Sequence, residues 1–114
     1  ITNFYIDKGG LIYKLVPITR WTYHSCSGNR DKSTIGIELI HKSGEFTEAQ
    51  YQSIIDLIYE LKIDCPNIKK ISSHDYRYMK YSGKRKGCPG NDFDWEKLKG
   101  LLYENKFEFE VYDV

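Results

Sequence analysis

The segment FTEAQYQSIIDLIYEL, residues 46–61, constrains the fold most strongly, because it places apolar side chains at helical spacing. The stripe that these side chains form comprises Tyr51, Ile54, Ile55, Ile58 and Leu61. Thr47 and Gln50 match the Thr-x-x-Gln capping box, which predicts that a helix begins at Thr47. A helix with a single apolar stripe buries it against another layer of structure, so this chain needs such a layer.

Segments with strand character lie on both sides of this helix along the chain. Residues 3–17, NFYIDKGGLIYKLVP, predict a β-hairpin, because two β-rich runs flank Gly9-Gly10 and glycine provides the positive φ of a tight turn. Residues 33–40, STIGIELI, form the clearest strand, since apolar side chains alternate along it. Residues 68–74, IKKISSH, predict a further short strand.

The end of the chain predicts a second helix, which begins near Asp92 or Asp94. Residues 106–114, KFEFEVYDV, alternate in polarity and are either an edge strand or a tail. The order β-β-β-α-β-α indicates the α/β class, with a single mixed β-sheet and helices packed on it. A chain of 114 residues is long enough for one core and too short for two, so residues 1–114 are predicted to form a single domain.

Composition argues against several classes of protein. A net charge of +1 disfavours a nucleic-acid binder that relies on attraction to phosphate. No apolar run approaches the roughly 20 residues of a transmembrane helix, so neither nucleic acid nor membrane is expected as a partner. A basic single-stranded nucleic-acid site over residues 76–86, using tyrosine stacking, is the alternative of a different class. Three cysteines cannot all pair, so a disulfide framework is not expected and a metal or free-thiol role stays open.

His74 and Cys88 are candidate metal ligands. His74 ends a predicted strand, where a scaffold holds a side chain rigidly, and Pro89 and Gly90 restrict the backbone beside Cys88. An imidazole and a thiolate together suit zinc. The alternatives are a structural histidine and an ordinary Cys-Pro-Gly turn.

Glu38 and Lys86 are candidate catalytic residues. An acid in the middle of an apolar strand is costly to bury, so the face of Glu38 is expected to open on a polar site. Its same-face neighbour Gly36 leaves room for a ligand to approach. Lys86 stands two residues before Cys88, where a fixed cation would stabilise a developing oxyanion beside a metal. The alternatives are a solvated glutamate on an exposed strand face and a solvated lysine in a basic loop.

Taken together, these motifs resemble type 2 N-acetylmuramoyl-L-alanine amidases. That family includes AmpD-like enzymes, phage lysozyme-amidases and peptidoglycan recognition proteins. STIGIELI, FTEAQYQSIIDLIYEL, ISSH and GKRKGCPGNDFDW follow in the family's order and at fitting spacing. The hairpin and the segment YHSCSG look like its second and third strands and its Trp-His-Ala-Gly-type loop. The resemblance runs from about Thr2 to Leu102, which is nearly the whole chain.

The resemblance implies an activity and a set of roles. The family reaction is zinc-dependent hydrolysis of the amide bond between N-acetylmuramic acid and L-alanine, with peptidoglycan or a muropeptide as the substrate. His74 and Cys88 match zinc ligands, and Glu38 matches the residue that transfers the proton of the attacking water. Lys86 matches the lysine that stabilises the tetrahedral intermediate.

The resemblance also implies residues that bind the substrate. His24 matches the loop histidine that lines the substrate groove. Arg85 is placed to bind a muropeptide carboxylate, since a planar guanidinium suits that group. The alternative function is a non-catalytic peptidoglycan-binding module of the same fold. A recycling enzyme would be cytoplasmic and a wall-degrading enzyme periplasmic or secreted, and the sequence leaves this choice open.

Two positions depart from the family pattern. Phage-type members carry a catalytic tyrosine where this chain has Thr2, so the chain favours the glutamate mechanism. The family's first zinc ligand is a histidine on a strand before the hairpin, and no residue from Ile1 onward matches it. We therefore expect residues 1–114 alone to hydrolyse muropeptides poorly. We also expect the edge of the strand Thr2–Ile6 to be covered by a partner chain or by a segment outside the given sequence.

Overall fold

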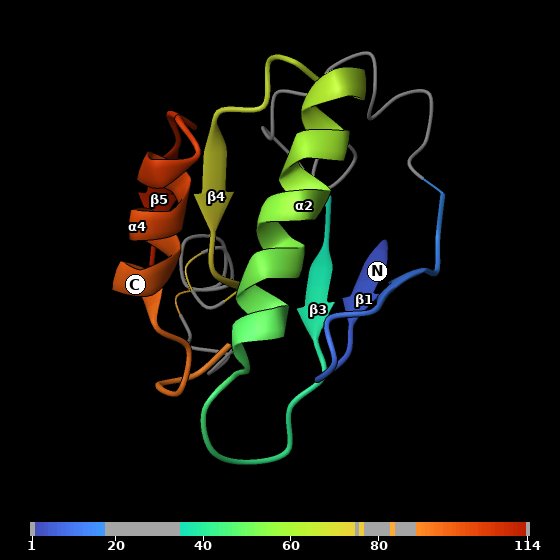
Figure 1. Ribbon diagram of the computed structural model, residues 1–114, viewed down its shortest axis with the longest axis vertical. Coiled ribbons are helices and arrows are strands. Elements are labelled where there is room, and N and C mark those ends of the chain that lie inside the picture. The colour runs from blue at the N-terminus through green and yellow to red at the C-terminus, as the bar shows by residue number, and fades with distance from the viewer. Residues whose placement is uncertain (1, 18–34, 75, 77–82, 84–88, 114) are drawn as a thin grey trace. The chain divides into compact units, whose positions relative to one another are not determined.

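The computed structural model of the protein describes residues 2–17, 35–74, 76, 83 and 89–113. The chain divides into two compact units, residues 1–68 and residues 69–114. The first unit contains three strands and the long helix α2, and the second contains two strands and the helix α4 (Figure 1). The prediction of a mixed α/β fold is confirmed, and the described strands form one group of three and one of two.

The first unit is built on a sheet with the strand order β2-β1-β3. Strands β1 (Phe4–Ile6) and β2 (Ile12–Lys14) are antiparallel, which confirms the predicted hairpin. Strand β3 (Ile37–Leu39) pairs with β1 in parallel. Strand β1 therefore lies in the middle of the sheet.

The central position of β1 corrects one prediction. The strand from Thr2 to Ile6 was expected to lack a neighbour, but β1 is hydrogen-bonded on one side to β2 and on the other to β3. The prediction was wrong because β3, far along the chain, returns in parallel register to the side of β1 that the hairpin leaves open. Among the described strands of this sheet, β2 and β3 are the outer ones.

Helix α2 (Glu48–Asp64) covers one face of this sheet. It begins at the predicted capping box, in which the Thr47 side chain accepts a hydrogen bond from the Gln50 amide and the Gln50 side chain accepts one from the Thr47 amide. All five residues of the predicted apolar stripe are buried. Leu57 and Leu61 pack with Phe4 of β1 in the core of the unit, and full burial of one such side chain contributes about 1.5–3 kcal/mol.

The buried side chain of Gln50 joins α2 to two strands. It is only 1% exposed. Its Nε2 donates to the carbonyl oxygens of Ile6 at 3.3 Å and Ile40 at 2.9 Å, while its Oε1 accepts from the Thr47 amide at 3.0 Å. Both of its amide hydrogens are thereby used, so a polar group inside the core carries no uncompensated desolvation cost.

The hairpin turn is tied to the first turns of α2. Thr47 Oγ1 donates to the carbonyl oxygen of Lys8 at 2.7 Å, and Ser53 Oγ donates to that of Gly10. Gly10 has a φ of 87°, and a Cβ at this position would lie 2.9 Å from both Ala49 O and Ser53 Oγ. Glycine is thus required here both by the backbone conformation and by the close approach of the helix.

Cys65 lies at the C-terminal end of α2, where its amide donates to Leu61 O at 2.7 Å. The residue is fully buried and disulfide-bonded, and its partner falls outside the described residues. The sequence predicted no disulfide framework, and the structure adds this one bond. No helix within the described part of the chain is long and apolar enough to cross a membrane.

The second unit pairs β4 (Lys70–Ser72) in parallel with β5 (Glu110–Tyr112). Helix α4 (Trp95–Glu104) connects them along the chain and begins at Asp94, whose carboxylate accepts a hydrogen bond from the Lys97 amide. The predicted start near Asp94 is confirmed. The sequence predicted either an edge strand or a tail for the C-terminal segment, and the structure contains a strand there.

Replacement of Gly10 by alanine tests the contact between hairpin and helix. Gly44 is the matched control, because its φ is 79° and nothing lies within 4 Å of the Cβ that alanine would add. The left-handed conformation costs each variant about 1 kcal/mol, and crowding costs Gly10→Ala a further ~1–3 kcal/mol. Urea unfolding should therefore show a clearly larger loss for Gly10→Ala. Equal losses in the two variants would contradict the close approach.

Candidate functional site

Glu38 is held on β3 by the pairing with β1. The register places Glu38 opposite Tyr5. Just before it, Gly36 donates its amide to Asn3 Oδ1 at 2.9 Å and accepts from the Asn3 amide at 3.0 Å. Asn3 Nδ2 also donates to Val16 O at 3.2 Å, so one side chain joins the segments on both sides of β1. The backbone that carries Glu38 is therefore fixed from the N-terminal end of β1.

The Glu38 side chain belongs to the sheet face opposite α2. Phe4 and Ile6 of β1 are buried toward the helix, so Tyr5 between them belongs to the other face. The register places Tyr13 and Glu38 on either side of Tyr5. Glu38 is exposed, which is compatible both with a site on this face and with the alternative of a solvated glutamate.

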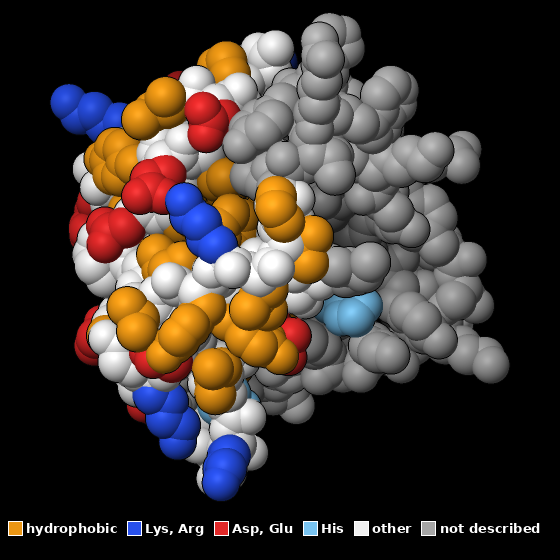
Figure 2. All heavy atoms as spheres, turned by 90° about the vertical axis from the view of Figure 1, so that its right-hand side faces the viewer, with side chains coloured by type: hydrophobic (Ala, Val, Ile, Leu, Met, Phe, Trp, Pro, Cys, Tyr) orange, Lys and Arg blue, Asp and Glu red, His pale blue; other side chains and the backbone are white. Residues whose placement is uncertain are grey.

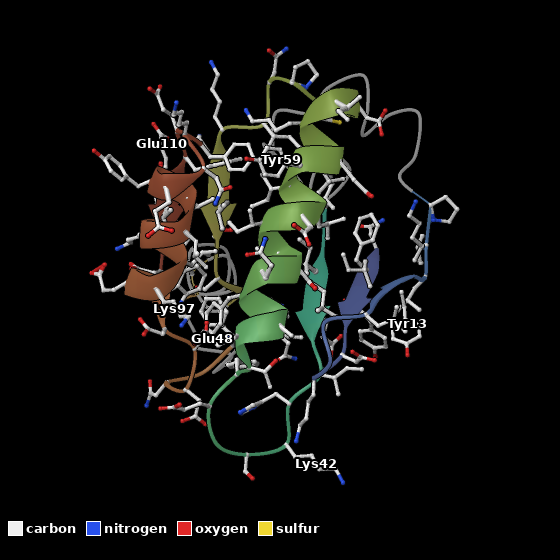
Figure 3. The ribbon with its side chains drawn as sticks, viewed as in Figure 1. Tyr13, Lys42, Glu48, Tyr59, Lys97 and Glu110 are labelled. Atoms are coloured by element: carbon white, nitrogen blue, oxygen red, sulfur yellow. The ribbon has the colours of Figure 1, made fainter. Side chains whose placement is uncertain are left out.

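Apolar and aromatic side chains are exposed along the hairpin that borders this face. Leu11, Tyr13 and Leu15 are 59%, 42% and 48% exposed. Figure 2 shows hydrophobic side chains gathered on the side of the first unit where the hairpin lies. Tyr13 projects from the hairpin away from α2 (Figure 3), and its hydroxyl donates to Asp7 Oδ2 at 3.2 Å. This hydrogen bond raises the pKa of Tyr13, so the phenol is neutral at neutral pH.

Thr2 lies next to the Glu38 carboxylate. Its Oγ1 is 3.4 Å from Glu38 Oε2, which is longer than the roughly 2.5–3.0 Å of an ordinary O–H···O hydrogen bond. The contact therefore leaves the carboxylate accessible. Sequence reasoning treated Thr2 as a departure from a catalytic tyrosine and missed this contact, because no local pattern signals a pair 36 residues apart.

The predicted strand was expected to run to His74, but β4 ends at Ser72, and His74 has helical backbone and an exposed side chain. Ser73 before it is only 3% exposed and donates its amide to Tyr112 O at 2.9 Å. Ser73 Oγ accepts a hydrogen bond from the Tyr76 amide at 2.8 Å. An exposed imidazole thus stands on a turn whose backbone is fixed on both sides.

The remaining predicted site residues, His24, Arg85, Lys86 and Cys88, lie outside the described residues. Glu38 belongs to the first unit and His74 to the second, and each is placed within its own unit. Where the structure describes the chain, no group of three or more His, Cys, Asp or Glu side chains is arranged to hold a metal ion. The grouping of the six residues into one site therefore stays a prediction.

His41 has a structural environment. Its ring stacks on Phe46, with ring centroids 4.1 Å apart and an angle of 22° between the planes. Its Nε2 is hydrogen-bonded to Gly44 O in the turn before α2. Both contacts tie His41 to the segment that leads into α2.

Comparison with protein families gives one match to this chain. The model of a family described as N-acetylmuramoyl-L-alanine amidase matches residues 1–91, which is most of the 114-residue chain. The matched region includes β1 to β4, Glu38 and His74, and it ends before α4 and β5. Comparisons with curated proteins and with solved structures gave no match.

The exposure of Glu38 predicts that its charge contributes little to folding. Glu38→Gln keeps the shape of the side chain and removes its charge. The interaction that this change affects is the long contact between Glu38 Oε2 and Thr2 Oγ1. The free energy of unfolding in urea should change by less than about 0.5 kcal/mol, as for other surface positions. Glu60→Gln, on the exposed side of α2, is the matched control. A loss above about 1 kcal/mol in Glu38→Gln alone would show that Glu38 is a structural residue.

Proposed function

Because the chain belongs to the N-acetylmuramoyl-L-alanine amidase family, we propose that it hydrolyses the amide bond between N-acetylmuramic acid and L-alanine in peptidoglycan or muropeptides. The observation that carries this proposal is the placement of Glu38. An exposed carboxylate occupies the middle of β3, on the sheet face that α2 leaves free, and its backbone is fixed by pairing with β1. A proton-transfer group needs this combination of rigid support and access.

His74 and Cys88 are the residues that would hold zinc. The exposed imidazole of His74, on its fixed turn, fits the nitrogen donor that zinc prefers, and Cys88 would add a sulfur donor. When bound, zinc would polarise the carbonyl of the scissile amide. A catalytic zinc site has about three protein ligands and keeps one position open for water or substrate.

Glu38 would act as the general base and then as the general acid. Its carboxylate takes a proton from the water that attacks the amide carbon. The same proton then passes to the nitrogen of L-alanine as the carbon–nitrogen bond breaks, so that the amine leaves neutral. Its exposure and the weak contact with Thr2 support this role, because the carboxylate is free to exchange a proton with a substrate.

The proposal also assigns roles to three further residues, Lys86, Arg85 and His24. The Lys86 ammonium would stabilise the negative charge that develops on the carbonyl oxygen. Arg85 would bind a carboxylate of the peptide stem, and His24 would line the groove that receives the substrate. These three roles are supported by the sequence motifs GKRKGCPG and YHSCSG.

Substitutions separate the catalytic role from the metal-binding role. Glu38→Ala should lower the rate of amide hydrolysis by about 10²–10⁴-fold, the usual contribution of a general base, and leave the zinc content unchanged. His74→Ala and Cys88→Ala should lower both. Lys86→Ala should lower the rate by about 10²-fold or more, in the range of one lost oxyanion donor. Rates and elemental zinc content are measured on the same purified samples.

Two control variants match these substitutions. Glu60→Ala removes an exposed carboxylate from α2, and His41→Ala removes a histidine with a structural environment. Neither should change the zinc content or the rate per folded molecule. Equal zinc loss in Glu38→Ala and His74→Ala would make Glu38 a ligand or a structural residue, and unchanged turnover in Glu38→Ala would overturn the mechanism. Tight binding of muropeptides with no turnover in any sample would favour the non-catalytic module.

A further inference from the structure

The residues after position 91 lie beyond the family match, yet they supply the pairing partner of β4, which ends two residues before His74. Strand β5 aligns with β4 in parallel, with Ser72 opposite Tyr112. The Glu110 amide donates to Lys69 O at 2.8 Å at one end of the pair. The Ser73 amide donates to Tyr112 O at 2.9 Å at the other. The pairing thus reaches the residue directly before His74.

Tyr112 contacts the turn that carries His74 on both sides of this histidine. Its main-chain carbonyl binds Ser73, and its ring stacks on the ring of Tyr76, with centroids 4.9 Å apart and 24° between the planes. The turn is closed by the hydrogen bond from the Tyr76 amide to Ser73 Oγ at 2.8 Å. The His74 backbone therefore lies between two residues that Tyr112 holds in place.

Tyr112 is itself held by its neighbours. Its hydroxyl donates to Glu110 Oε2 at 3.0 Å. The residue after it, Asp113, accepts a hydrogen bond from Lys99 Nζ of α4 at 2.8 Å, and this bond lowers the pKa of Asp113. Glu110 is the first residue of β5. The C-terminal helix and strand thus fix the ring that stacks on Tyr76.

We propose that Tyr112 is a positioning residue for His74: by stacking on Tyr76 and pairing with Ser73, it fixes the turn that presents the imidazole to the zinc. This rests on the proposed role of His74 as a ligand. A metal ligand has to be held within about 0.5 Å of its productive position. His74 is exposed and lies two residues beyond a strand of three residues, so the strand alone gives it little support. The stacking of Tyr112 on Tyr76 adds a restraint on this turn. Tyr112 belongs to a part of the chain that the family match does not include.

The experiment compares three variants of the full chain. Tyr112→Ala removes the ring and keeps the main-chain carbonyl, whereas Tyr112→Phe keeps the ring and loses only the bond to Glu110. Tyr103→Ala is the control, because Tyr103 is 85% exposed on α4. Amide hydrogen exchange is measured by NMR at Ser73 and Tyr76, with the amides of α2 as a check on folding. Zinc affinity is measured by titration of the same samples.

Tyr112→Ala should accelerate exchange of the Tyr76 amide by about 3- to 10-fold, the effect expected from the loss of one stacked aromatic pair, while the amides of α2 stay protected. Its zinc affinity should fall by about 10-fold or more, as for other residues that orient a metal ligand. Tyr112→Phe and Tyr103→Ala should resemble the wild type in both measurements.

Two outcomes would overturn the inference. One is unchanged exchange at Ser73 and Tyr76 in Tyr112→Ala. The other is faster exchange in Tyr112→Ala with unchanged zinc affinity, provided that His74→Ala does lower the zinc affinity. The zinc affinity of His74→Ala distinguishes this result from a failure of the proposed function. If His74 is not a ligand, that affinity stays unchanged. In that case the exchange data alone decide whether Tyr112 holds the turn.

Discussion

The buried amide of Gln50 connects α2 with the end of β1 and with the residue directly after β3. It hydrogen-bonds to main-chain oxygens of Ile6 and Ile40 and to the amide of Thr47, and it is almost completely excluded from water. Loss of this side chain would remove all three hydrogen bonds, each with a net contribution of about 0.5–1.5 kcal/mol, and the Ile6 oxygen would keep only its bond from the Ile40 amide. A polar residue of this kind specifies the position of the helix, because only one position of α2 brings the Gln50 amide within hydrogen-bond distance of all three partners.

The position of the catalytic candidate follows from this connection. Gln50 binds Ile6 at the end of β1 and Ile40 just beyond β3, so it holds together the ends of the two strands whose register places Glu38 opposite Tyr5. Asn3 performs the same function at the other end, through Gly36. Strands of three residues have few hydrogen bonds of their own, and side chains therefore supply much of the restraint on the site.

The sequence predicted the elements that depend on local patterns. Helix α2 was predicted with its cap at Thr47 because periodicity and a capping box act over a few residues, and the hairpin was predicted from its glycines. The pairing of β3 with β1, the contact of Thr2 with Glu38 and the role of Gln50 were not predicted, because they join residues far apart in the chain. The strand position of Glu38 is confirmed, whereas β4 ends at Ser72, two residues before His74. The roles of both residues come from the family resemblance.

The central claim is that this chain cleaves one particular amide bond, and the products of the reaction test it most directly. The purified protein is incubated with zinc and a disaccharide-peptide, and the mixture is analysed by mass spectrometry, with a chelated sample beside it. The account predicts slow release, as expected for residues 1–114 alone, of an intact disaccharide with a free lactyl carboxylate and a stem peptide with a free L-alanine amine, both absent after chelation. Cleavage at any other bond, or a substrate that is bound and stays intact at every zinc concentration, would contradict it.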